Sequence, residues 1–339
     1  MKKDFGSLKN GAKAYLYEIS CGELKACICD YGATLVQLYV PDSKGNLADV
    51  VLGFDSATEY DHNDAYLGAT VGRNANRIKN GTFSIGEKTV QMPQNDNGNS
   101  LHSAPESYAF RMWNVEKHTE NSICLYLHSP DGDQGLPGNA DIRVTYTLES
   151  DGVLRIAYDA LSDQDTIFNL INHSYFNLAG HTHTEKAIEQ NLMLACERYA
   201  VSDQKLIPTG ELRAVAGTPM DFRTAKPIGR DLGMDHPCIK MHKGYDHNFV
   251  ISANPCAILS DAASGRSLAI TTDCPGIQFY SGHSLNVEKG KDGVRYTPWS
   301  GVALETQYYP DSVNHPEWPQ PICKAGHPYH SETVYRFAW

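Results

Sequence analysis

Long apolar runs are absent from this 339-residue sequence, and no stretch approaches the roughly 18 consecutive apolar residues of a membrane-spanning helix. Lys2 and Lys3 open the chain with positive charge, but the run of about 7–15 apolar residues that completes a signal peptide does not follow. The sequence therefore predicts neither membrane insertion nor export. We expect a cytoplasmic protein.

Basic residues are fewer than acidic ones in this sequence. The chain carries 29 Lys and Arg against 40 Asp and Glu, which gives a formal net charge of −11 at pH 7. Acidic surfaces repel the phosphates of nucleic acids, and no basic stripe is present that could hold an anionic lipid surface. The composition excludes nucleic acid and membrane as partners.

Cysteine pairs and metal-binding motifs are also missing. The nine cysteines form an odd set without a CxxC pair, so we expect reduced thiols in the core. Fourteen histidines raise the question of a metal, but His181 and His183 are only two positions apart, and neither HExxH nor a three-histidine spacing occurs. The sequence predicts no bound metal.

Helical periodicity is nearly absent too. Only residues 57–63 and 228–232 are helix candidates, and both are too brief to cover a parallel sheet. Most other segments alternate apolar and polar residues with period two, as a strand with one buried face does. The alternation is clearest in residues 142–148 and recurs in residues 36–40, 123–127 and 154–158.

Turn residues separate these alternating segments. Residues that tolerate positive φ recur between them, as in Asn80-Gly81 and Asp151-Gly152. Length alone suggests two domains of about 150 residues, but β-sandwiches can exceed 200 residues, and no linker or repeat divides this chain. We predict an all-β protein, a large single-domain antiparallel β-sandwich over residues 1–339 with few short helices.

Several short segments concentrate the polar side chains from which a sugar-binding acid–base site could be built. A histidine and a carboxylate can act as acid and base near neutral pH, whereas Asn, Arg and Asp offer hydrogen bonds to adjacent sugar hydroxyls. The concave face of a sandwich could bring such segments together. They are residues 72–78, 99–102, 169–178, 244–249 and 303–307.

With these segments, the sequence resembles the aldose 1-epimerase family over nearly its whole length. Each match alone is weak, but their order along the chain is specific to the family. The resemblance implies a galactose mutarotase-like supersandwich. It also implies an isomerase of hexose metabolism that interconverts the α and β anomers of free aldohexoses such as galactose and glucose, without cofactor or metal. Further matching segments are residues 30–34, 40–42, 49–55, 207–211, 215–223, 278–282 and 307–316.

The resemblance also implies roles for particular residues. Glu305 matches the general base that takes the proton of the anomeric hydroxyl, and His173 matches the general acid that protonates the ring oxygen, so that the ring opens to the aldehyde. Ser103 and Ile171 depart from the family pattern, which more often has glycine and threonine there. The substrate-binding positions matched are Arg77, His102, Asp246, Asn76, Tyr175 and Gln278.

Other interpretations of the same residues stay open. Asp246 and Glu305 could serve as the two carboxylates of a glycosidase, although His173 has no place in that mechanism. The fold could instead support a sugar-binding or regulatory module without turnover. A relative acting on hexose 6-phosphates should carry more Arg and Lys beside the pocket. The preferred aldose among galactose, glucose, xylose and arabinose stays undecided. We expect a monomer whose partner is a small monosaccharide, and we place His247 at the surface or in a turn.

Overall fold

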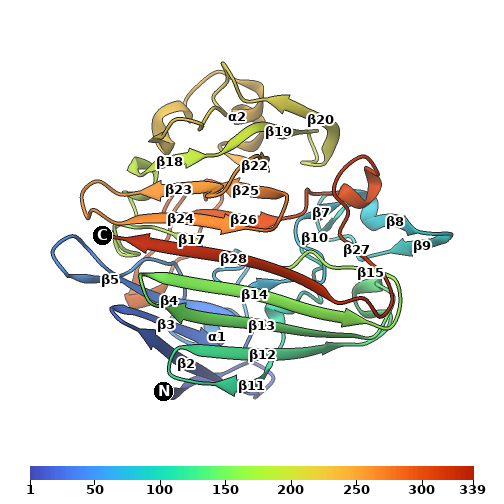
Figure 1. The fold of residues 1–339 in the computed structure, drawn as a ribbon, viewed down its shortest axis with the longest axis horizontal. Coiled ribbons are helices and arrows are strands. Elements are labelled where there is room, and N and C mark those ends of the chain that lie inside the picture. The colour runs from blue at the N-terminus through green and yellow to red at the C-terminus, as the bar shows by residue number, and fades with distance from the viewer.

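A nine-stranded antiparallel sheet is the largest element of the computed structural model, which describes residues 1–339. β28, close to the C-terminal end of the chain, lies in the middle of this sheet between β14 and β24 (Figure 1). In sheet order the strands are β11 (Asn114–His118), β12 (Ser122–Ser129), β13 (Ala140–Glu149), β14 (Val153–Ser162), β28 (Tyr329–Ala338), β24 (Ser267–Thr272), β23 (Ala257–Ser260), β18 (Asn191–Leu194) and β21 (Lys226–Pro227).

A six-stranded antiparallel sheet carries most of the polar segments that the sequence analysis singled out. In sheet order it comprises β17 (Tyr175–Phe176), β26 (Val302–Gln307), β25 (Gly276–Tyr280), β22 (Asp246–Ile251), β19 (Cys196–Ser202) and β20 (Pro208–Ala214). β26 is buried along all six of its residues, so neither of its faces meets solvent. This strand therefore lies inside the protein rather than on a half-exposed face.

A five-stranded N-terminal sheet and several two-stranded sheets complete the fold. The N-terminal strands, drawn in blue, lie beside β11, β12 and β13 (Figure 1). They are β1 (Lys2–Ser7), β2 (Lys13–Cys21), β3 (Leu24–Cys29), β4 (Thr34–Pro41) and β5 (Leu47–Asp49). The short pairs are β6 (Thr70–Val71) with β16 (Ile171–Asn172), β7 (Arg77–Ile78) with β10 (Ser100–Leu101), β8 (Thr82–Ile85) with β9 (Lys88–Gln91), and β15 (Thr166–Ile167) with β27 (Ile322–Cys323).

The predicted alternation is confirmed in the large sheet. In β13 every second residue, from Ala140 to Leu148, is buried, whereas the residues between them are partly or fully exposed. These side chains join a core of 52 buried residues that draws on all three large sheets. At the predicted turn after β13, Asp151 and Gly152 both have positive φ, and a Cβ on Gly152 would lie 2.5 Å from the carbonyl oxygen of Phe337. The all-β sandwich is therefore correct as predicted.

Helices are few and short. The first predicted helix is realised as α1 (Ala57–Tyr60) and the second as the 3-10 helix η5 (Ile228–Asp231), but α2 (Pro237–His242) was missed. Only six residues long, α2 shows no periodicity and relies on Pro237 at its start and Lys243 with positive φ at its end. No helix combines the length and apolar character that crossing a bilayer requires. The other 3-10 helices are η1 (Lys79–Gly81), η2 (Tyr108–Phe110), η3 (Asp133–Gly135), η4 (Ala187–Glu189), η6 (Lys291–Gly293) and η7 (Ser312–Asn314).

Candidate active site

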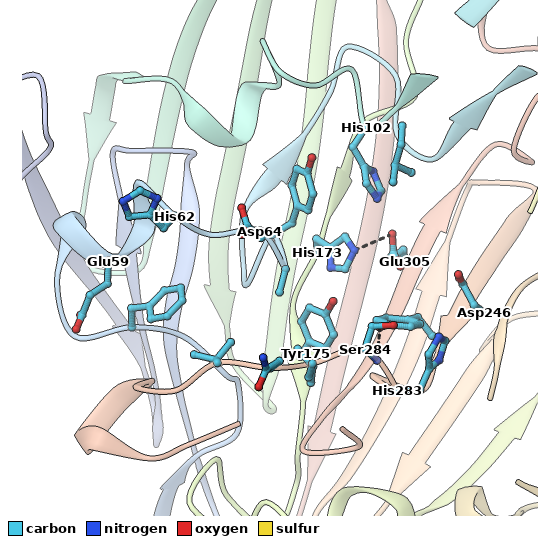
Figure 2. Close-up of a pocket in the computed structure, with 18 of the residues that line it drawn as sticks. Glu59, His62, Asp64, His102, His173, Tyr175, Asp246, His283, Ser284 and Glu305 are labelled. Carbon is cyan, nitrogen blue, oxygen red and sulfur yellow. Dashed lines mark hydrogen bonds and ion pairs between the residues drawn. The ribbon is translucent and has the colours of Figure 1, made fainter. Parts of the chain in front are cut away.

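One cavity of about 850 Å³ gathers the polar segments (Figure 2). Its walls come from the six-stranded sheet, from the β7–β10 pair with the residues beside it, and from segments 54–66 and 283–289. Of the predicted site residues only Gln278 does not line it, because this buried side chain lies behind Asp246 and contacts it directly. The predicted residues that line the cavity are Asn76, Arg77, His102, His173, Tyr175, Asp246 and Glu305.

Strand register brings the polar side chains of the sheet into rows. Gln278 in β25 lies directly opposite Glu305 in β26 on one side and Asn248 in β22 on the other. Since alternate residues of a strand share a face, Asp246 and Gln307 project from the same face as this row. Residues from distant parts of the sequence thus meet on one face.

His173 and Glu305 form a closely spaced buried pair. The Nε2 atom of His173 lies 3.6 Å from Oε2 of Glu305, and their side chains are only 6% and 3% exposed (Figure 2). Neither Nδ1 of His173 nor Oε2 of Glu305 has a hydrogen-bond partner. Buried polar atoms are nearly always satisfied, so an unpaired Oε2 of Glu305 that faces Nε2 of His173 in a cavity indicates a place for a ligand oxygen.

Burial has opposite effects on the two members of this pair. It lowers the pKa of His173 to about 4, because the charged imidazolium is poorly solvated there. Burial also raises the pKa of Glu305 well above its usual value, and the negative charge of Asp246 adds to that increase while Arg77 opposes it. Burial therefore favours the uncharged form of each group, whereas the proton placement expected from the sequence has both groups charged.

Two tyrosines hold the ring of His173. Tyr175 lies 5.1 Å from it between ring centroids with an interplanar angle of 33°, and Tyr66 lies 6.0 Å away at 27°. Tyr66 also contacts His102, with centroids 4.8 Å apart. The sequence analysis missed Tyr66, which sits in a loop with positive φ and has no motif that marks it. Its position fixes the plane of the imidazole.

The tautomer of His102 follows from one hydrogen bond. Its Nδ1 accepts from the backbone N–H of Asn76 at 3.1 Å, so the neutral ring carries its proton on Nε2. Burial keeps the ring neutral by lowering its pKa well below the usual value. This N–H can donate to a sugar oxygen in the cavity.

Ligand atoms of His102, His173 and Glu305 lie within 4.8 Å of one another, a spacing that could hold a metal ion. A metal needs a lone pair from each ligand, but His102 presents a protonated Nε2 while Asn76 occupies its Nδ1. The remaining two groups fall short of the three protein ligands of a catalytic zinc site. The donor chemistry of this cluster therefore does not fit a resident metal.

Arg77 lies between two carboxylates. Its Nε donates to Asp96 at 2.7 Å, and its Nη1 lies 4.0 Å from Oδ2 of Asp246. Gln278 donates from Nε2 to Oδ1 of Asp246 at 2.6 Å. Burial pushes the pKa of Asp246 upward, but Arg77, His242 and this hydrogen bond outweigh it, so the pKa is lowered and the carboxylate stays ionised. Asp96 was missed by the sequence analysis.

Comparison with known proteins identifies the family to which this site belongs. The family model for aldose 1-epimerase matches residues 15–336. A galactose mutarotase from Mus musculus is 39% identical over 98% of this chain and 97% of its own length. The chain belongs to the aldose 1-epimerase family. The resemblance drawn from the sequence is confirmed, and with it the assignment of the chain to the isomerases.

Further relatives of this chain come from bacteria and animals. An aldose 1-epimerase from Haemophilus influenzae is 39% identical over 91% of both chains. Among solved structures, an aldose epimerase homologue from C. elegans has a TM-score of 0.88 at 33% identity, with 96% of this chain and 99% of that chain covered. A galactose 1-epimerase from Lactobacillus acidophilus has a TM-score of 0.86 at 26% identity, with 100% and 98% covered. The sandwich architecture is therefore that of the family.

The fold accommodates the two departures of this chain from the family pattern. Ser103 has φ of 55°, a region that favours glycine, and its hydroxyl bonds both the backbone N–H and the carbonyl of Asn74 at 3.0 Å. Ile171 pairs with Val71 between β16 and β6 and is buried in a small apolar cluster. Neither residue lines the cavity.

The surface or turn position expected for His247 is wrong. This ring is buried within β22, with its centroid 4.0 Å from that of His242, because the strand turns the residue away from the cavity and toward α2. Its Nδ1 accepts from the backbone N–H of Asp246 at 3.1 Å. His283 and Tyr280, which the sequence analysis did not select, line the cavity beside Asp246.

Proposed function

We propose that this chain interconverts the α and β anomers of free aldohexoses such as galactose and glucose in the 850 Å³ cavity, with Glu305 and His173 as the proton-transfer pair. The observation that carries the proposal is their spacing: two buried titratable groups, 3.6 Å apart, each with an open polar atom. A sugar that offers its anomeric hydroxyl to one group and its ring oxygen to the other would contact both.

The reaction needs one proton on the pair at every stage. As carboxylate, Glu305 takes the proton of the anomeric hydroxyl while protonated His173 donates to the ring oxygen, and the C1–O5 bond breaks to give the aldehyde. The pair is then a carboxylic acid and a neutral imidazole. After rotation about C1–C2, Glu305 returns a proton to the carbonyl oxygen, His173 takes the proton on O5, and the other anomer closes. Burial favours the placement that accompanies the open chain.

The surrounding residues would hold the sugar during that rotation. Ionised Asp246 accepts from a ring hydroxyl, Arg77 donates to neighbouring oxygens, and the Nε2–H of His102 donates beside His173. Asn76 and Gln278 hold His102 and Asp246 in place by hydrogen bonds. Tyr175 packs against the ring of His173. A buried acceptor such as Asp246 discriminates strongly against analogues that lack the hydroxyl it binds.

Polarimetry is the direct test of this function. We expect catalytic amounts of the protein to speed the decay of freshly dissolved α-D-galactose and α-D-glucose toward the same final rotation, and the faster sugar identifies the preferred substrate. No acceleration by folded protein that still binds the sugar would favour a binding module. Release of phenol from an aryl galactoside that disappears in Glu305→Gln would favour a glycosidase.

Three broader expectations complete the proposal. Residues 1–339 are proposed to fold as one domain, since the family model spans residues 15–336 and one core cluster reaches from Tyr17 to Phe337. The nine cysteines are all free thiols, which supports a cytoplasmic location. A monomer that binds a monosaccharide as its only partner is the proposed working state.

A further inference from the structure

A chain of buried side-chain amides connects two halves of the cavity beneath its floor. Gln307, at the end of β26, accepts from Nδ2 of Asn76 at 3.5 Å. It donates from Nε2 to Oδ1 of Asn248 at 3.2 Å and to Oε1 of Gln278 at 3.4 Å. Gln278 in turn donates from Nε2 to Asp246 at 2.6 Å. One glutamine thus connects the Asn76 loop with the carboxylate of Asp246.

The orientation of the Gln307 amide is determined by its neighbours. Its side chain is fully buried and does not line the cavity, so the protein must satisfy every polar group that it carries. Its two N–H groups face two oxygens, of Asn248 and Gln278, while its own oxygen faces the amino group of Asn76. A flipped amide would set oxygen against oxygen on one side and nitrogen against nitrogen on the other.

That orientation sets the direction of the next amide. Because Oε1 of Gln278 faces the amino group of Gln307, its Nε2 must point the other way, toward Asp246. A reversed Gln278 would present its oxygen to a carboxylate oxygen, and the two would repel each other. The direction of donation therefore runs from Gln307 through Gln278 to Asp246.

The same chain reaches the other wall of the cavity. The backbone N–H of Asn76 donates to Nδ1 of His102, and Oδ1 of Asn76 accepts from the backbone N–H of Arg77 at 2.8 Å. Gln307 therefore contacts the side chain of Asn76, the residue that makes both of these hydrogen bonds.

We propose that Gln307 is a positioning residue for sugar binding: it sets the direction of the Gln278 amide, which then holds Asp246 as an oriented, ionised acceptor for a sugar hydroxyl. The inference rests on the proposed function, which assigns Asp246 to the substrate. Gln307 itself touches no substrate, so its removal should weaken binding and spare the proton transfers at His173 and Glu305.

Two substitutions of Gln307 distinguish its effect on the orientation of the Gln278 amide from its effect on packing. Gln307→Met fills the volume without polar groups, and Gln278 is then free to rotate. Gln307→Glu keeps the shape but removes the amino group, so Gln278 turns its own amino group toward residue 307 and its oxygen toward Asp246. We expect KM for the preferred sugar to rise roughly tenfold in the Met variant, as for loss of a hydrogen bond to a charged group, and further in the Glu variant. In the Met variant, which adds no charge beside Glu305, kcat should stay within about threefold of the parent protein.

A double-mutant cycle tests whether Gln307 affects KM through Gln278. In a Gln278→Met background, Gln307→Met should raise KM no further, because the amide through which it acts is gone. A purely structural role for Gln307 would instead give effects that multiply. Gln190→Met is the matched control, since Gln190 is an equally buried glutamine with three hydrogen bonds outside the cavity. It should leave KM unchanged.

The outcomes separate this inference from the function beneath it. An unchanged KM in both Gln307 variants, or effects that multiply in the double variant, would overturn the positioning role while anomer interconversion stands. Asp246→Asn is measured in parallel: an unchanged KM there would remove Asp246 from substrate binding, and the inference with it. Circular dichroism and thermal unfolding accompany each variant, and the isosteric Gln307→Glu provides the measurement if Gln307→Met does not fold.

Discussion

Two buried ionisable pairs in this protein are built on opposite plans. Lys291 and Asp49 approach to 2.5 Å with side chains only 2% and 5% exposed, and the ammonium group also donates to the carbonyl oxygens of Val36 and Val51. His173 and Glu305 are equally buried but stand 3.6 Å apart with open polar atoms. The first pair uses its hydrogen-bonding capacity within the protein, whereas the second leaves part of it for a ligand. The difference indicates which pair supports the fold and which supports chemistry.

The comparison predicts its largest effect at Glu305. Glu305→Gln removes the group that exchanges a proton with the anomeric hydroxyl, so kcat should fall by about 10²–10⁴, the usual contribution of one positioned acid or base. Sugar binding should remain, and the unfolding temperature should not fall, because burial disfavours the charge of the Glu305 carboxyl group and an amide carries no charge. Polarimetry and thermal unfolding provide the measurements. Glu332→Gln, at a partly buried position of β28 outside the cavity, is the control and should turn over normally.

The matching change in the other pair should act on stability. Lys291→Met leaves the carboxylate of Asp49 buried without its cation, which typically costs about 3–5 kcal/mol of unfolding free energy. Urea denaturation measures this loss, and the folded fraction should keep the parent kcat. Lys186→Met, which breaks an exposed pair with Glu189, should change stability by less than about 1 kcal/mol. Equal losses in the two variants would contradict the contrast drawn between buried and exposed pairs.

Acid pH offers a smaller effect with a defined sign. The folded-state pKa of His173 is lowered from 6.5 to about 4. Between pH 4 and pH 6.5 this residue is therefore protonated in the unfolded chain but neutral in the folded protein. The contribution of His173 to stability is therefore complete above pH 6.5 and decreases as the pH falls toward 4, by at most about 1.4 kcal/mol per pH unit. His173→Asn should flatten the pH dependence of the unfolding free energy in this window. An unchanged slope would show that His173 is not buried as a neutral ring.

The smallest effect is expected at Ser103. Ser103→Gly relieves a positive φ but removes two hydrogen bonds to Asn74, and the two changes offset each other. We expect unfolding free energy to change by no more than about 0.5–1 kcal/mol, and kcat and KM to stay within twofold. Polarimetry and urea denaturation check both. A large rise in KM would show that the serine shapes the adjoining His102.

The sequence allowed the sandwich to be predicted because its pattern is local. In β13 the burial of each side chain follows from its neighbours two positions away, so alternation alone predicts the strand and its buried face. Glu305 could be picked out for a related reason, since a carboxylate inside the apolar run 302–304 breaks the pattern of a buried strand.

The missed residues depend on contacts that no local pattern encodes. Asp96 matters because Arg77 reaches it, Tyr66 because His173 stacks on it, and Gln307 because three other amides face it. Arg77 and Asp96 lie in neighbouring segments of the sequence. Tyr66 and Gln307, in contrast, are far along the chain from most of the residues that they contact. The proton placement on His173 and Glu305 could not be predicted for the same reason, because it depends on burial created by the whole fold.

The position of β28 has a consequence for how the chain is made. Val153 in β14 pairs with Arg336 and Ala269 in β24 pairs with the same residue, so the nine-stranded sheet stays in two halves until residues 329–338 have been synthesised. Until then β14 and β24 each expose an unpaired edge, a condition that invites association between nascent chains. Completion of the large sheet must therefore follow translation of its central strand.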